Sequence, residues 1–424
     1  MKVKDKVRTA VAKARELPAK VRTARANHKL RRTPTGLSFA LADAIGQLRP
    51  EHWDALTADA SVCLSRPFLE CLEAAGPSNL QGHYALVYRG ARPVAALACQ
   101  SVDVGAADLP SRKEAAGRLK KARDKGLERV HSRVLVCGNL LGWGPQGVAL
   151  APDEDPEELW PAVAEALYRI RRADKLFGET GLVMIKDLTD AEAPSEAPLR
   201  RFSYRPVETE PNMVLPLKAA WGDFEGYLQA LKSDYRSGIK KQIREVEAAG
   251  LVLERLDAEG VAREKAAIHG LYLQVHEKQK MRLVTISEDW IPTLAARFGA
   301  DFRTTVLRRA ADAKIVGFIT TLKDRDGAIG YYIGFDKATA AAGVPLYLRL
   351  LYALVEDALA MGAAWASLGR TALEPKAKLG ARPVAVRCYL RHRVPALNAV
   401  VSALLRAVPE PAQAPERKPF KGEA

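Results

Sequence analysis

The residues from 331 to 351 have the types needed to hold a phosphate-bearing cofactor. They read YYIGFDKATAAAGVPLYLRLL, which predicts a strand, a loop of small residues and a helix beginning at Pro345. Proline is tolerated at a helix start, because the N–H that it lacks has no intrahelical partner there. The free N–H groups and the dipole of such a helix start suit a pyrophosphate, and Lys337 adds charge. Gly343 stands where the backbone would approach the ligand, although an ordinary strand-to-helix connection has the same spacing and stays open as the alternative.

A second glycine pattern lies in residues 142–147, GWGPQG, which match the spacing G-x-G-x-x-G letter for letter. A dinucleotide-binding loop needs a helix directly after it, since the helix N-terminus binds the pyrophosphate. Here VALAPDEDP follows, with Pro152 and a turn before any helix. We therefore expect a glycine turn that joins two strands rather than a nicotinamide site.

Other catalytic motifs are incomplete. Residues 365–369, WASLG, have tryptophan where a nucleophile elbow has its first glycine, and no G-x-x-x-x-G-K occurs. The five cysteines include no C-x-x-C pair and the seven histidines form no H-E-x-x-H cluster. These patterns argue against a kinase, an ATPase, a serine hydrolase or a structural metal site, and we expect no metal cofactor.

Residues 228–246 predict one amphipathic helix with a basic stripe. Lys232, Arg236, Lys240 and Arg244 recur every four residues beside an apolar face. A basic stripe next to a cleft attracts a phosphate-bearing donor or acceptor. A solvated basic face is the more common meaning of this pattern, so both interpretations stay open.

The elements that must position these motifs come in two similar rounds. Each round predicts helices, antiparallel strands, a longer helix and further strands, with a hairpin over residues 83–104 in the first. This order predicts an α+β fold with mixed sheets rather than a doubly wound parallel sheet, and 424 residues suit two domains. The expected division is a basic helical extension (1–36), an N-terminal domain (37–215), a C-terminal domain (216–395), and a C-terminal helix and tail (396–424).

The positive charge is concentrated at the N-terminus. Residues 1–32 carry twelve Lys or Arg against Asp5 and Glu16, a local charge of +10 out of a total of +15. Apolar residues at helical spacing predict a basic amphipathic helix, of the kind that binds anionic membranes or nucleic acid. No aromatic residue precedes Phe39 for stacking on bases, which favours a membrane over nucleic acid. A solvated extension that adds nothing to the fold is the alternative.

Composition also bears on the compartment. No apolar run is long enough to span a bilayer, and the start of the chain lacks the apolar stretch of a secretory signal. Scattered cysteines, odd in number, suit a reducing environment. We expect a cytoplasmic protein, held at the inner membrane face through residues 1–32.

In its order of strand, loop, helix and strand, the chain resembles the GNAT acyltransferase superfamily. It looks most like the branch of the Fem-type peptidyltransferases and the BioF-like acetyltransferases, over roughly residues 40–395. The stretches that carry the resemblance are LKSDYRSGIKKQIREVEAAG, GAIGYYIGFD with the helix PLYLRLLYALVEDALAMG, and LGRTALEPKAKLGARP. One departure is clear, because the usual acetyl-CoA loop, Q/R-x-x-G-x-G/A, is replaced by KATAAAGVP with Gly343 alone.

The resemblance implies transfer of an acyl or aminoacyl group from acyl-CoA, or from aminoacyl-tRNA, to an amine. Backbone N–H groups near residues 331–334 would polarise the carbonyl, and a base would take the proton from the attacking nitrogen. The catalytic candidates are His276, Glu374 and Tyr332. The cofactor-binding candidates are Tyr331, Gly334, Lys337, Gly343 and Arg370. The substrate-binding candidates are Arg236, Lys240, Lys280 and Lys376.

The implied acceptor is the amine of a small molecule or of a peptidoglycan precursor, in bacterial cell-envelope metabolism, and the only nucleic acid expected is tRNA as donor. The competing hypothesis is a non-catalytic adaptor, a degenerate acyltransferase fold held at the membrane by its tail. The missing loop glycines favour the adaptor. The tyrosines Tyr331 and Tyr332 and the lysine-containing stretch LGRTALEPKAKLGARP favour the enzyme. The identities of donor and acceptor and the oligomeric state stay open.

Overall fold

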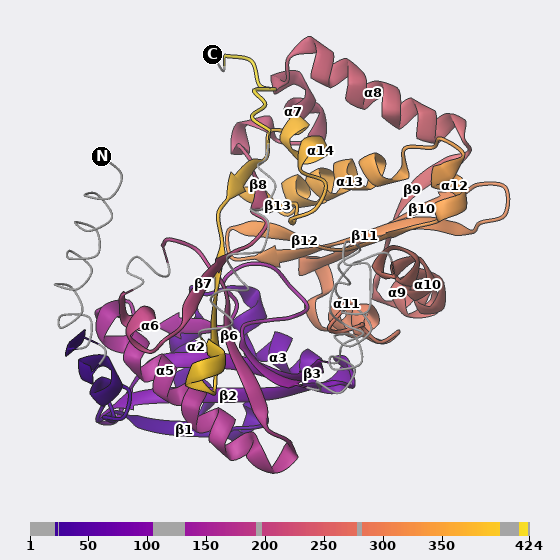
Figure 1. Ribbon diagram of the computed structural model, residues 1–424. Helices are drawn as coiled ribbons and strands as arrows, with labels where there is room; N and C mark the ends of the chain where they lie inside the picture. The colour runs from indigo at the N-terminus through magenta and orange to yellow at the C-terminus, as the bar shows by residue number, and fades with distance from the viewer. Residues whose placement is uncertain are drawn as a thin grey trace, which may run out of the picture.

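The computed structural model describes residues 22–23, 25–104, 132–191, 197–277, 282–398 and 415–422. Two mixed β-sheets with helices on their faces form two domains, which lie one above the other in Figure 1. The predicted α+β class with mixed sheets is confirmed. Most of the predicted basic extension and of the predicted C-terminal helix and tail lie outside the described residues.

The first sheet follows the order β1-β2-β3-β4-β6-β15-β7, and a short strand, β5, pairs with β3. Its strands are β1 (Ser38–Ala42), β2 (Leu80–Arg89), β3 (Arg92–Val104), β4 (Ser132–Cys137), β5 (Val148–Leu150), β6 (Thr180–Leu188), β7 (Arg205–Glu208) and β15 (Arg387–His392). Buried residues alternate along β2 between two cores. Tyr84 and Leu86 face α2 (Pro50–Thr57) and α3 (Arg66–Ala75), whereas Ala85 and Val87 face α5 (Pro156–Ala173), as expected for a strand covered on both sides.

The second sheet follows the order β14-β8-β13-β12-β11-β10-β9. Its strands are β8 (Asn212–Pro216), β9 (Leu251–Leu256), β10 (Phe302–Arg309), β11 (Ile315–Asp324), β12 (Gly327–Phe335), β13 (Trp365–Ser367) and β14 (Arg382–Val384). One face packs against α7 (Phe224–Ala230), α8 (Ser233–Ala248) and α13 (Leu346–Ala360). The other packs against α9 (Ala258–Arg263), α10 (Lys265–His276) and α11 (Trp290–Phe298).

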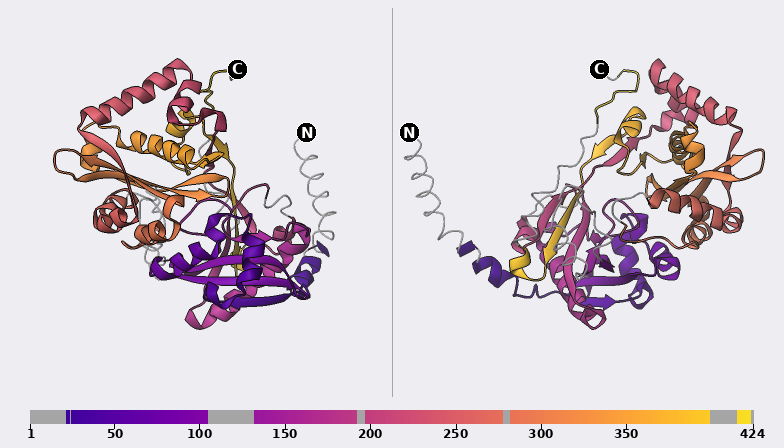
Figure 2. Two further views of the ribbon diagram at one scale, coloured as in Figure 1. Left: turned by 180° about the vertical axis from the view of Figure 1, so that it is seen from behind. Right: turned by 45° about the vertical axis from the view of Figure 1, so that its right-hand side comes forward.

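The two sheets have the same pattern, and one strand, β15, joins the first sheet out of chain order. In each sheet four neighbouring strands pair antiparallel, the fourth pairs in parallel with a fifth, and two further strands follow antiparallel; the parallel pairs are β4–β6 and β12–β13. The strand between β6 and β7 is β15, from the far end of the chain, and the strand between β13 and β14 is β8, which directly follows β7. Figure 2 shows the gold β15 running among the strands of the first sheet. The predicted boundary between residues 215 and 216 falls inside β8.

A shared apolar core joins the two domains. Phe68 of α3 meets Trp290 of α11 edge to face, with ring centroids 5.7 Å apart, and both side chains are fully buried. Burying each such aromatic side chain stabilises the fold by roughly 2–3 kcal/mol. At the rim, the Asp324 carboxylate accepts the Val62 backbone N–H at 2.7 Å and the Ser61 hydroxyl at 3.3 Å. The domains therefore meet through apolar packing and through specific polar contacts.

The predicted helix over residues 228–246 is wrong in its continuity, because two helices, α7 and α8, replace it. Leu231 and Lys232 leave the helix to pair with the segment 415–422. The Lys232 N–H donates to Pro419 at 2.8 Å, and the Lys421 N–H donates to Ala230 at 2.9 Å. Phe420 stacks on Trp221 at 5.2 Å, so the end of the chain supplies the backbone partners that break the helix.

Other expectations can be compared directly. Residues 142–147 connect β4 to β5 without a helix, which confirms a glycine turn between two strands. Before β1, the Arg31 guanidinium donates to the Ser203 hydroxyl, so the extension contacts the first domain at this residue. Across the described residues, none of the helices combines the length and the apolar character that a membrane crossing requires.

The place of β15 between β6 and β7 predicts that removing the end of the chain destabilises the domain at its beginning. A chain that stops at residue 386 lacks β15, so β6 and β7 lose their shared neighbour, and Cys388 and Tyr389 leave the core. We expect hydrogen exchange at the amides of β4 and β6 to accelerate by at least tenfold. The control stops at residue 398, which keeps β15 but removes Phe420 as well. Equal protection of β6 in both truncated chains would contradict this role of β15.

Candidate functional site

The site is organised by the place where β12 and β13 cease to pair. Their parallel register covers only Ala328–Ala366 and Ile329–Ser367. Beyond it, the chain after β13 continues against β8, with Leu368 N–H donating to Met213 at 2.8 Å. The second half of β12 therefore pairs with β11 on one side and, among the described residues, with no strand on the other. An unpaired strand edge presents backbone donors and acceptors to an extended ligand.

A bulge sets which groups this edge presents. Tyr331 and Tyr332 together lie opposite Thr320, and the Tyr332 N–H donates to the Thr320 hydroxyl at 2.9 Å. The Asp336 N–H bonds to Val316 in β11 at 2.8 Å. Because bonded pairs alternate in an antiparallel ladder, the N–H of Ile333 points away from β11, toward the open edge. Among the backbone N–H groups expected to act as donors in residues 331–334, the N–H of Ile333 faces the open edge. The N–H of Tyr332 already donates to Thr320.

The two tyrosines of the bulge differ in their surroundings. Tyr331 is buried in the shared core against Phe68, and its hydroxyl has no partner in the described part of the chain. Tyr332 packs edge to face on Tyr272 at 5.5 Å, and its hydroxyl donates to the Leu141 carbonyl of the first domain at 3.3 Å. Burial raises the pKa of both phenols well above 10. Tyr332 is therefore neutral at pH 7 and can give a proton.

His276 is the imidazole that lies nearest along this chain of rings. It stacks on Tyr272 at 4.9 Å, and its Nε2 lies 3.1 Å from the Thr285 hydroxyl. Burial and the charge of Arg282 lower the pKa of His276 below 6.5. The ring is therefore neutral at pH 7 and able to accept a proton. Tyr272 separates it from Tyr332, so a proton relay between them would need a water or a substrate group.

The candidate phosphate-binding turn is more ordered than its composition suggests. Residues after Asp336 form a short helix, α12 (Lys337–Ala341), whose N-terminus is capped by the Asp336 carboxylate. α13 begins at Leu346, one residue later than expected, and has no side-chain cap. Its N–H groups at Tyr347 and Leu348 therefore lack intrahelical acceptors. Gly343 has φ +92°, and no atom lies within 4 Å of where a Cβ would stand, so the approach to α13 is open.

The stretch LGRTALEPKAKLGARP, residues 368–383, contributes one buried lysine, one largely buried arginine and one carboxylate that is held in an ion pair. Arg370 pairs with Asp187 of β6, and Lys376 is buried in α14 (Leu373–Lys378). Burial lowers the pKa of Lys376 to about 8. Glu374 instead pairs with Arg417 at 2.7 Å, and this contact lowers its pKa, so the carboxylate is a weaker base than a free glutamate.

The remaining candidates lie apart from this group. Arg236 contacts the Leu231 carbonyl at 3.4 Å, and Lys240 pairs with Glu225 at 2.9 Å, both on the α8 side of the sheet. Gly334 serves packing, because a Cβ there would stand 2.6 Å from the carbonyl carbon of Leu271 in α10. Lys280 lies outside the described residues.

The first domain supplies functional candidates that the sequence motifs did not assign. The loop of residues 138–147 brings the Leu141 carbonyl to Tyr332 and the Trp143 ring to Arg370, whose guanidinium carbon is 5.3 Å from the ring centroid. The glycine spacing marked this loop, but its partners belong to the other domain. Nothing in the local sequence around Asp187 indicated that it pairs with Arg370.

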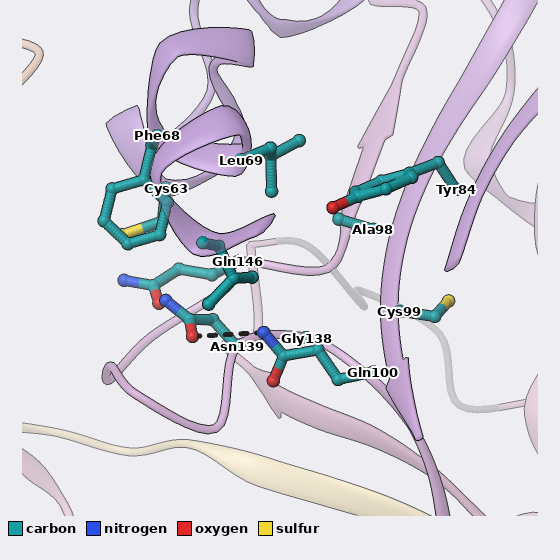
Figure 3. A pocket seen from close by; sticks show the side chains of 11 residues that line it. Cys63, Phe68, Leu69, Tyr84, Ala98, Cys99, Gln100, Gly138, Asn139 and Gln146 are labelled. Carbon is teal, nitrogen blue, oxygen red and sulfur yellow. Dashed lines mark hydrogen bonds between the residues drawn. The ribbon is translucent and has the colours of Figure 1, made fainter. Parts of the chain in front are cut away.

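A small pocket in the first domain explains how this loop is held. Gln100, Asn139 and Gln146 line it beside Phe68 and further apolar side chains (Figure 3). The Gln100 side chain accepts the Leu140 N–H at 2.8 Å and Asn139 accepts the Leu141 N–H at 2.9 Å, while Gln146 donates to the Trp143 carbonyl at 2.8 Å. These amides fix the loop, and the pocket is too small to hold a substrate.

A comparison with protein families matches one region of the chain. Residues 233–393, which run from α8 to β15, match the acetyltransferase (GNAT) domain. A search of curated proteins found no significant match.

Several solved structures are similar to this chain at low sequence identity. A tandem GNAT protein from the clavulanic acid biosynthesis pathway is 12% identical with a TM-score of 0.49, covering 85% of this chain and 99% of that one. FemX is 10% identical with a TM-score of 0.48, covering 86% and 99%. L-PGS from Bacillus licheniformis is 13% identical with a TM-score of 0.44, covering 79% and 95%. The sequence match concerns residues 233–393 alone, which are similar to the acetyltransferase (GNAT) domain.

Proposed function

We propose that the protein transfers an acyl or aminoacyl group from a CoA thioester, or from an aminoacyl-tRNA ester, to an amine. The observation that carries this proposal is the unpaired edge of β12 after Ile329, where the Ile333 N–H faces outward beside the Tyr332 phenol. An extended donor arm can pair with this edge. Its carbonyl then lies near a backbone donor that can stabilise the developing oxyanion.

The reaction needs one nucleophile, one base and one acid. The acceptor nitrogen attacks the carbonyl carbon, and the tetrahedral intermediate then loses the thiolate or alkoxide as the C–S or C–O bond breaks. His276, neutral at pH 7, would take the proton from the nitrogen through an intervening water. Tyr332, whose phenol keeps its proton, would protonate the leaving group. Glu374 is less suited to the role of base because of its pairing with Arg417.

The donor phosphates would bind at the start of α13. The start of α13 has two N–H groups without intrahelical acceptors and the positive end of the helix dipole, and Gly343, three residues before it, has open space around it. Lys337 adds a screened charge. For the acceptor, we keep the amine of a small molecule or of a peptidoglycan precursor, as the sequence resemblance implies, and a location at the cytoplasmic face of the membrane. The adaptor hypothesis predicts no donor binding, which the next experiment tests.

Gly343→Val should weaken CoA binding by tenfold or more, measured by isothermal titration with CoA and acetyl-CoA. The added side chain fills the space through which the phosphates reach α13. The control is Gly362→Val, at the other end of the same helix. Gly362 also has positive φ, +70°, and open space around it, so both variants carry similar backbone strain. Lys337→Ala should change the affinity less than threefold. If Gly343→Val and Gly362→Val weaken CoA binding equally, the turn is only a connection between β12 and α13. If the unmodified protein does not bind CoA, the adaptor hypothesis is favoured.

Tyr332→Phe should lower the rate of thiol release from acetyl-CoA in the presence of an amine mixture by about 10²-fold, with little change in donor KM, as expected for the loss of a general acid. Tyr272→Phe removes a neighbouring hydroxyl and should have a small effect.

The acid limb of the pH–rate profile should lie below pH 6.5, because His276 must be neutral to accept a proton and its pKa is lowered. If the pH–rate profile of His276→Gln equals that of the unmodified protein, His276 is not the base.

A further inference from the structure

The space above Gly369, just after β13, is lined by two nitrogen donors from different domains. Gly369 has φ +78° and carries no side chain into this space. A Cβ built there would stand 3.6 Å from the indole Nε1 of Trp143 and 3.7 Å from the Nζ of Lys376. Trp143 comes from the 138–147 loop of the first domain and Lys376 from α14 of the second. The two donors converge on one point that neither domain forms alone.

Neither donor has an acceptor among the described residues. Lys376 is 2% exposed, yet no carbonyl or carboxylate in the described part of the chain bonds or pairs with its Nζ. Glu210 is the carboxylate whose charge acts on it, and it does so without forming an ion pair. Burying an ammonium without a partner costs several kcal/mol. A ligand that supplies the missing negative charge explains why such a group is buried here.

The surrounding charges also favour an anion. Arg370 lies over the Trp143 ring and pairs with Asp187, and Lys186 pairs with the same carboxylate. Although burial opposes ionisation, these two cations hold the pKa of Asp187 at about 2, so it is ionised at pH 7. The positive charges of Arg370 and Lys186 therefore face a single negative charge, that of Asp187, and Lys376 adds a further positive charge. The buried Nε of Arg370 has no acceptor within the described residues either.

The donors are held in position before any ligand arrives. Asp187 accepts the Gly144 N–H at 3.2 Å, and Lys186 donates to the Gly142 carbonyl at 2.8 Å. Gln146 bonds the carbonyl of Trp143 itself, from the pocket of Figure 3. Three contacts therefore fix the loop that carries the indole. Groups fixed in advance bind with little loss of conformational entropy.

We propose that Trp143 and Lys376 form a binding site for an oxyanion group, a carboxylate or a phosphate, with Arg370 adding positive charge. Given the proposed transferase function, this group belongs to the acceptor and orients its amine toward the edge of β12. The site would then select acceptors that carry an acidic group. Only the identity of the ligand as acceptor rests on the proposed function, because the two donors converge whatever reaction follows.

The test titrates the full-length protein with inorganic phosphate and, separately, with acetate, at constant ionic strength. The indole N–H signal of Trp143, assigned by its loss in Trp143→Phe, is followed by ¹H–¹⁵N NMR, and affinities come from calorimetry. We expect a saturable shift of this signal with at least one probe, and the tighter probe identifies the group. Lys376→Met should weaken binding by tenfold or more, and Trp143→Phe, which removes the N–H but keeps a ring, by about threefold.

Two substitutions at nearby residues serve as matched controls. Lys378→Met removes an exposed lysine from the same helix, and Trp365→Phe removes an indole N–H that already donates to Asp326. Both should leave the affinity unchanged. If neither probe gives a saturable shift, or if Lys376→Met binds as tightly as the unmodified protein, the site is refuted. CoA binding measured on the same samples separates this failure from failure of the proposed function.

Stability and pH give a second readout. Lys376→Met should keep or raise the melting temperature, because it removes an unpaired buried charge; a clear loss of stability would show a structural role and overturn the proposal. Since burial lowers the pKa of Lys376 to about 8, anion affinity should fall as pH rises from 7 to 9. Between pH 8 and 10.5 the unfolded chain binds a proton that the folded chain does not, so the unmodified protein should gain stability relative to Lys376→Met as pH rises.

Discussion

The return of β15 to the first sheet is the constraint on which the rest of the structure depends. The second sheet is built from the consecutive strands β8 to β14, whereas the first sheet needs β15, a strand that follows the whole second sheet in the chain. The crossing strands bring the ends of β6 and β13 close enough for Asp187 and Arg370 to pair. Because backbone ladders set this geometry, the relative position of the two domains is restricted before any side chain contributes.

The candidate site depends on this fixed position of the two domains. The edge of β12, the start of α13 and Lys376 belong to the region that matches the GNAT domain, whereas the Leu141 carbonyl and the Trp143 indole come from the first domain. A first domain free to move would leave Tyr332 without its carbonyl acceptor and Lys376 without its neighbouring indole. The return of β15 therefore explains how the first domain contributes groups to the candidate site.

Several departures from ordinary packing lie near this junction, and others lie elsewhere in the molecule. Tyr331, Trp290 and Asn139 have buried polar atoms without partners in the described chain, and Asp187 and Ala372 adopt positive φ without being glycine. Each of these features costs free energy. Stable proteins tolerate such costs mainly where function requires them. The apolar core around Phe68 and Trp290 offsets the cost, since it buries large aromatic side chains from both domains.

The sequence alone determined those features that depend on neighbours in the chain. Alternation and turn residues predicted the hairpin of β2 and β3, the strand–helix order around residues 331–351, and the glycine turn at 142–147, because local propensity and periodicity govern such elements. The resemblance in the strand and helix around Tyr331 also indicated the family, together with Tyr332, Arg370 and Lys376 as candidates. The roles of these candidates stay predictions.

Only the tertiary structure decided which elements pair over long distances. No local signal shows that β15 enters the first sheet, that residues 415–422 interrupt the helix between Ala230 and Ser233, or that Asp187 meets Arg370. Strand pairing is decided by the free energy of the whole sheet, in which residues about 200 positions apart become neighbours. For the same reason, the partners of Lys376 and Trp143 follow from the fold and cannot be inferred from their spacing.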